Sequence, residues 1–69
     1  MNISLNLRFL LDESASSADV ARLLRNAANR IEDLNYVDCL RTSKDTTRDI
    51  TRAVLNGTLN VGSYSLRKE

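Results

Sequence analysis

The chain has 69 residues, with ten basic and nine acidic side chains and a formal net charge of +1 at pH 7. This length allows a single domain, residues 1–69, whose own core gives only marginal stability. One cysteine and no histidine exclude an internal disulfide and leave a zinc site without its usual ligands. We therefore expect no metal and no cofactor, and we expect a homodimer, because a second subunit is the remaining source of stability.

The cellular setting can also be predicted from these residue types. The lone Cys39 fits a reduced, cytoplasmic compartment, and we expect it to be a half-buried structural thiol. The N-terminal apolar run is interrupted by Arg8 and two asparagines, which a signal peptide would not tolerate. No apolar stretch approaches the roughly 20 residues of a membrane helix. Reading Met1 as the natural start, we expect a complete cytoplasmic protein that does not bind membranes.

Residues 2–11, NISLNLRFLL, alternate between apolar and polar side chains. This period of two predicts a strand that ends near Phe9 or Leu10. One face of the strand is apolar, and the other carries Asn2, Ser4, Asn6 and Arg8. We expect the strand to lie at a sheet edge, where it invites pairing with another chain.

Residues 17–34 show the clearest pattern in the chain. Their apolar side chains fall within an arc of roughly 160° on a helical wheel, which predicts an amphipathic helix of about five turns. Ser16 and Asp19 have the spacing of a capping box at its start, and Asn35 stands at its C-cap. The polar side consists of Asp19, Arg22, Arg25, Asn26, Asn29, Arg30, Glu32 and Asp33.

The next segments give weaker signals. Residues 36–41 contain β-forming side chains without clean alternation, so they could form a short strand. Residues 42–47 are rich in helix-capping side chains, and a second helix is predicted from there to about Asn56. The apolar stripe of this helix would consist of Ile50, Ala53 and Val54.

Gly57 ends the second predicted helix as a C′ glycine. Residues 58–66 predict a last strand, or a hairpin that turns at Gly62, and residues 67–69 predict a solvated tail. The order is strand, helix, possible strand, helix, strand. It predicts a small two-layer α+β domain with two helices packed on one face of a small β-sheet.

The residue types needed for catalysis are scarce. Without histidine the usual general base at neutral pH is absent, and both glycines follow the last predicted helix, so no phosphate-binding loop is present. Asp45 and Asp49 could share one helix face, but Arg48 and Arg52 follow each by three residues, which favours intrahelical ion pairs. We predict that the chain is not an enzyme and has no small-molecule substrate.

The polar face of the long helix is the main candidate binding surface. Arginine and asparagine make directional hydrogen bonds, and arginine is enriched at binding hot spots. Proteins of this size are often encoded by phages or mobile elements and act on host machinery. These observations predict a viral type of inhibitor, adaptor or regulator that binds a protein partner. The anchors would be Arg22, Arg25, Asn29 and Arg30.

A different partner is suggested by residues 4–9, SLNLRF. This segment resembles the N-terminal ribbon of ribbon-helix-helix repressors. The resemblance implies a dimeric DNA-binding regulator whose first strands pair into a ribbon in the major groove. It places Ser4, Asn6 and Arg8 at the base-reading positions, and it makes Leu5, Leu7 and Phe9 the anchors of the ribbon.

Overall fold

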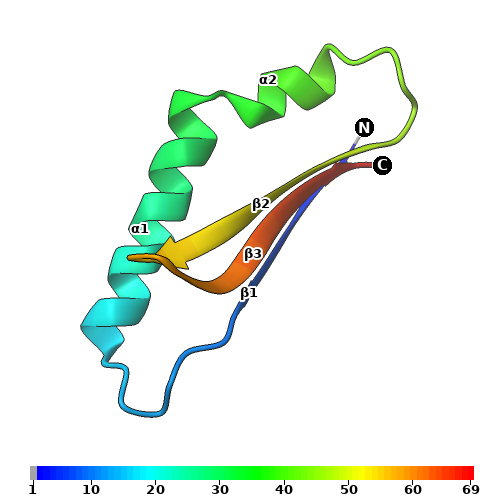
Figure 1. Cartoon of the computed structure of the whole chain (residues 1–69). Coiled ribbons are helices and arrows are strands. Elements are labelled where there is room, and N and C mark those ends of the chain that lie inside the picture. The colour runs from blue at the N-terminus through cyan, green and yellow to red at the C-terminus, as the bar shows by residue number, and fades with distance from the viewer. Residues whose placement is uncertain (1) are drawn as a thin grey trace.

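A computed structural model describes residues 2–69 and shows a helical layer on one face of a β-sheet (Figure 1). Both helices lie between strands, which confirms the predicted α+β class. The molecule is elongated, with extents of 43 × 19 × 19 Å. In chain order the elements are β1 (Ile3–Phe9), α1 (Ser17–Asp33), α2 (Tyr36–Arg41), β2 (Arg48–Asn56) and β3 (Leu59–Lys68).

The sheet is antiparallel, with strand order β1-β3-β2. β3 is therefore central, and β1 lies at an edge, as predicted. Two backbone hydrogen bonds extend the β1–β3 ladder beyond the strand ends: Asn2 N donates to Glu69 O at 3.2 Å, and Glu69 N donates to Asn2 O at 2.9 Å. These bonds hold the two ends of the chain side by side (Figure 1).

The sheet has one apolar and one polar face because successive side chains of a strand point to opposite sides. The helices cover the apolar face over β2 and β3. The opposite face is polar and carries no helix in the described part of the chain. The buried core between the layers consists of Leu23, Ala27, Tyr36, Leu40, Ile50, Val54, Val61, Tyr64 and Leu66.

α1 matches the helix predicted over residues 17–34. The capping box is present: Asp19 N donates to Ser16 Oγ at 3.1 Å, and Ser16 N donates to Asp19 Oδ2 at 3.0 Å. A cap of this kind contributes about 1 kcal/mol. The helix ends at Asp33 and its C-cap is Leu34, one residue before the predicted cap; Asn35 follows in the left-handed conformation with φ of 50°.

Two predicted elements are wrong. Residues 36–41 form the short helix α2, because Tyr36 and Leu40, one turn apart, both enter the core. The predicted second helix is the strand β2, in which Ile50 and Val54 are four residues apart on the same side of the strand and are both buried. A spacing of four residues fits a helix and a strand alike, and pairing with β3 decides between them.

Three further expectations change with these elements. Asp45 and Asp49 do not share a helix, and Asp49 forms an ion pair at 3.5 Å with Arg67. Arg67 and Lys68 belong to β3 rather than to a tail. Cys39 is exposed on α2, not half-buried.

Both glycines have positive φ and belong to the sheet. Gly57 (φ 67°) begins the two-residue turn of the β2–β3 hairpin, where the first turn position favours glycine. Gly62 (φ 155°) lies inside β3 rather than at a hairpin turn. A Cβ at Gly62 would lie 2.0 Å from Arg8 O, so only glycine lets β1 approach this closely.

β1 extends beyond the helical cover. Its ends pack against the core through Ile3 and Phe9. Between them, Leu5 and Leu7 lie on the helix-facing side of the sheet but are 51% and 45% exposed. The period-two pattern thus identified the apolar face of this strand correctly, although the helices do not cover its middle.

Candidate functional site

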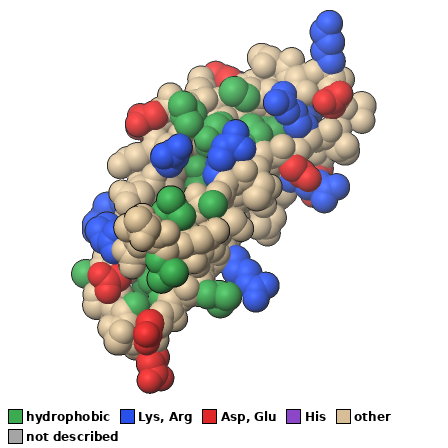
Figure 2. All heavy atoms as spheres, viewed as in Figure 1, with side chains coloured by type: hydrophobic (Ala, Val, Ile, Leu, Met, Phe, Trp, Pro, Cys, Tyr) green, Lys and Arg blue, Asp and Glu red, His purple; other side chains and the backbone are tan. Residues whose placement is uncertain are grey.

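A cleft with a volume of about 480 Å³ lies between α1 and the edge strand β2. α1 forms one wall and β2 the other, while β3 contributes the floor. Figure 2 shows hydrophobic side chains at the surface between the helices and the sheet, with Lys or Arg side chains lying across them. The lining residues of the cleft are Asn26, Ala27, Asn29, Arg30, Ala53, Val54, Leu55 and Tyr64.

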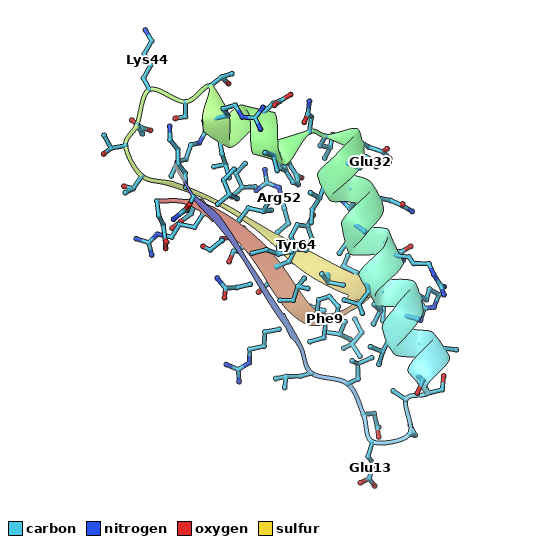
Figure 3. All side chains as sticks on the ribbon, turned by 180° about the vertical axis from the view of Figure 1, so that it is seen from behind. Phe9, Glu13, Glu32, Lys44, Arg52 and Tyr64 are labelled. Atoms are coloured by element: carbon cyan, nitrogen blue, oxygen red, sulfur yellow. The ribbon has the colours of Figure 1, made fainter. Side chains whose placement is uncertain are left out.

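Tyr64 comes from the central strand and points toward the helical layer (Figure 3). The residue is only 1% exposed, and its hydroxyl oxygen has no hydrogen-bond partner among residues 2–69. A buried hydroxyl without a partner costs about 1–3 kcal/mol, so native proteins seldom leave one. This hydroxyl is the most unusual polar group of the cleft.

The surroundings of Tyr64 keep it protonated. Burial raises its pKa above the usual value of 10.0, and the neighbouring Tyr36 adds to this effect. The Arg30 guanidinium lies near enough to lower the pKa, but this opposing effect is smaller. Tyr36 and Arg30 both lie close enough to the hydroxyl to interact with it, but neither has the geometry of a full hydrogen bond. At physiological pH Tyr64 is therefore a neutral O–H group that is available to donate.

The α1 wall supplies the charge and the amides of the site. Asn26, Asn29 and Arg30 lie one turn or less apart, so the helix places them along the same cleft. No carboxylate is among the lining residues, and no ion pair within residues 2–69 involves Arg30. The cleft consequently has an uncompensated positive charge beside a hydroxyl that lacks a partner.

Two side-chain contacts join the helices to β2. Arg22 lies one helical turn before Asn26, and its Nη2 donates to Asn56 Oδ1 at 3.0 Å, which joins α1 to the end of β2. Arg52 lies on the helix-facing side of β2, where its guanidinium carbon stands 5.4 Å from the centroid of the Tyr36 ring. This cation–π contact joins β2 to α2.

The structure separates the four residues predicted to bind protein. Asn29 and Arg30 lie together at the cleft. Arg22 bonds Asn56 and also stands 3.8 Å from Asp19 in an ion pair, so it is already engaged. Arg25 is exposed on the same helix but does not line the cleft.

The residues predicted to read DNA occupy a different surface. Asn6 and Arg8 are exposed on the polar face of β1, which is opposite the helices. They pair in register with Ser65 and Ser63 of β3 in the same chain. One edge of β1 is thus paired with β3 of the same chain and its other edge is free, so the ribbon expected from the resemblance to ribbon-helix-helix repressors stays a prediction.

Sequence reasoning missed two polar members of the site. Asn26 belonged to the predicted polar helix face but was not chosen as an anchor. Tyr64 lay in the predicted last strand, and nothing in its local sequence indicated that α1 would pack above it. Only the antiparallel pairing of β2 with β3 brings Tyr64 beneath Arg30.

Neither a metal-binding cluster nor a membrane-spanning helix is found among residues 2–69. No group of three or more His, Cys, Asp or Glu side chains is placed to hold a metal ion. None of the helices described is long and apolar enough to cross a membrane. Comparison with models of protein families, with curated proteins and with solved structures finds no match for this chain.

Proposed function

We propose that this chain is a small, non-enzymatic, cytoplasmic binding protein that acts as an inhibitor, adaptor or regulator of a protein partner. The contact surface is the cleft between α1 and β2. The observation that carries the proposal is the pairing of an uncompensated Arg30 with the unpartnered hydroxyl of Tyr64. A buried polar group without a partner is explained when a bound molecule supplies that partner.

Binding fits the chemistry of the cleft better than catalysis does. Its lining groups are amides, one guanidinium, one phenol and apolar side chains. Because the pKa of Tyr64 is raised, the phenol does not act as a base near neutral pH. The same groups are well suited to orient a ligand through hydrogen bonds within an apolar surround.

The proposal can be tested with a photo-crosslinking amino acid placed at two positions of α1. Asn29→p-benzoylphenylalanine puts the probe in the cleft, and Arg25→p-benzoylphenylalanine is the matched control on the same helix. We expect the Asn29 probe to capture one defined protein from a lysate of the source organism, identified by mass spectrometry. The purified captured protein should then bind the unmodified chain and bind Arg30→Gln more weakly.

Two results would contradict this function. Equal capture from both probe positions would show that the cleft is not the contact surface. Unchanged affinity of the purified protein for Arg30→Gln would show that the charge of the cleft is not used. Binding is measured by calorimetry, with Arg25→Gln as the control for a changed helix charge.

A second candidate function is DNA binding through the polar face of the sheet. The observation that favours it is the exposure of Asn6 and Arg8 on a sheet face without helical cover. Sheets can present such side chains to the major groove. Against it, Arg67 on the same face is paired with Asp49 at 3.5 Å. Affinity for duplex DNA that falls steeply with salt would support this function, and no binding at low salt would exclude it.

We also propose that two copies associate along the free edge of β1. The support is the half-exposure of Leu5 and Leu7 on the helix-facing side of that edge strand. Pairing two edges satisfies free backbone groups and would cover part of this apolar surface. Sedimentation velocity should show a dimer that Leu7→Lys dissociates, and a monomer at all concentrations would refute it.

A further inference from the structure

We propose that the ligand of the cleft is an extended acidic segment of the partner protein, bound beside the edge of β2 with one Asp or Glu side chain directed into the cleft. The Tyr64 O–H group donates a hydrogen bond to this carboxylate, and Arg30 pairs with it. This inference rests on the proposed protein-binding function. It adds the chemistry of the segment that is recognised.

Charge complementarity selects a carboxylate. Arg30 is the charged group of the cleft lining, which contains no acidic side chain, and Asn26 and Asn29 add amide donors. The Tyr64 hydroxyl is neutral because burial raises its pKa, so it can donate to an anion. An acceptor with two oxygens can bond the hydroxyl and the guanidinium at once.

The hydroxyl is closed to solvent in the free protein, and Arg30 is near enough to influence its pKa. Arg30 belongs to an exposed position of α1 and has no ion pair among the described residues. A carboxylate that pairs with the Arg30 guanidinium would therefore lie next to the Tyr64 hydroxyl. In the complex the hydroxyl has the partner that it lacks in the free chain.

The second wall of the cleft favours a polypeptide over other anionic molecules. Ala53, Val54 and Leu55 line the cleft from β2, an edge strand that pairs only with β3. A free strand edge offers backbone donors and acceptors that an extended peptide can pair with. The apolar side chains of this wall can also contact the apolar side chains of a bound peptide. Nucleic acid would instead require several basic side chains along its phosphates.

The test is an NMR titration of the isotopically labelled full chain with two short capped peptides. Both consist of alternating Thr and Val, and they differ in a central Glu or Gln. We expect the Glu peptide to shift the signals of the Arg30 guanidinium and the Asn29 side-chain amide saturably. The Gln peptide should bind about tenfold more weakly, because it lacks the charge-assisted hydrogen bonds.

Variants assign the effect to the cleft. Arg30→Gln should abolish the preference for the Glu peptide, and Tyr64→Phe should reduce it, whereas Arg25→Gln should retain it in full. A folded spectrum of each variant confirms that the loss is local.

Two outcomes would overturn the inference. In the first, both peptides shift the cleft signals with equal affinity, so the carboxylate is not recognised. In the second, inorganic phosphate or a short DNA duplex shifts these signals while the peptides do not. If either occurs while crosslinking at Asn29 still captures a protein, only the acidic segment is refuted; without that capture, the proposed function fails as well.

Discussion

The close approach of β1 to Gly62 makes a quantitative prediction for Gly62→Ala. The added Cβ would lie 2.0 Å from Arg8 O, 2.8 Å from Phe9 Cα and 2.9 Å from Arg8 C. All three are backbone atoms, so β1 must move. Overpacking costs about 1–3 kcal/mol, and a non-glycine residue at positive φ adds about 1–2 kcal/mol. The sum, about 2–5 kcal/mol, approaches the whole stability expected of a domain this small.

Gly57→Ala is the matched control for this prediction. Gly57 has φ of 67°, but nothing lies within 4 Å of its added Cβ. It should therefore show only the backbone cost of about 1–2 kcal/mol. Urea unfolding followed by far-ultraviolet circular dichroism measures both variants. If Gly62→Ala costs no more than Gly57→Ala, the close contact between β1 and β3 is not a determinant of this fold.

Two predictions concern ionisation. Hydrogen bonds from the Ser16 backbone N–H and with its side chain hold the pKa of Asp19 below the ordinary value of 3.8. Wild type should therefore have its full stability advantage over Asp19→Ala above pH 3.8 and lose it as the pH falls through the pKa of Asp19 in the folded protein. Urea unfolding at several acidic pH values measures this difference in the free energy of unfolding. A difference that does not change with pH would refute the prediction. Burial raises the pKa of Tyr64 above 10.0, so stability should fall as the pH rises through that value. In Tyr36→Phe, where Tyr64 is the remaining tyrosine, absorbance should record phenolate formation above pH 10.0, and an ordinary midpoint would contradict the burial argument.

The first half of the chain was predictable because its periodicity favours one element in each segment. In residues 3–11 five alternating apolar positions favour a strand over the helical stripe that Ile3, Leu7, Leu10 and Leu11 could also form. In residues 17–34 the charged and asparagine side chains fall on one side of the helix. Ser16 and Asp19 also fix the helix start by a local interaction that needs no tertiary contact. The boundaries of β1 and α1 follow from these local signals.

The second half was not predictable from periodicity. Ile50 and Val54 satisfy both periods, so only the pairing with β3 distinguishes strand from helix. One local signal pointed to a hairpin: Asn56-Gly57 between apolar segments is typical of one, although the observed turn consists of Gly57 and Thr58. A C′ glycine and the first residue of this hairpin turn both have positive φ, which explains why Gly57 fitted both interpretations.

The candidate site was half predictable for a related reason. Asn29 and Arg30 belong to a helix face that the sequence defines, and the structure places both at the cleft. Tyr64 is distant from them in sequence, and its role depends on the order β1-β3-β2, which places its strand in the centre of the sheet. Which strand residues lie against a helix face depends on the strand order of the sheet, and the local sequence does not give that order.

The most direct test of the account is the stability of Tyr64→Phe with and without the Glu peptide. Without peptide, the variant should be more stable than wild type by about 1 kcal/mol, because it removes a buried hydroxyl that has no partner. At a peptide concentration of about 100 times the wild-type Kd, wild type gains about 2.7 kcal/mol. If Tyr64→Phe binds the Glu peptide about tenfold more weakly, it gains roughly 1.4 kcal/mol less stability than wild type does. This smaller gain cancels the stability advantage that the variant has without peptide. A variant that is less stable without peptide, or an advantage that the peptide leaves unchanged, would contradict the account.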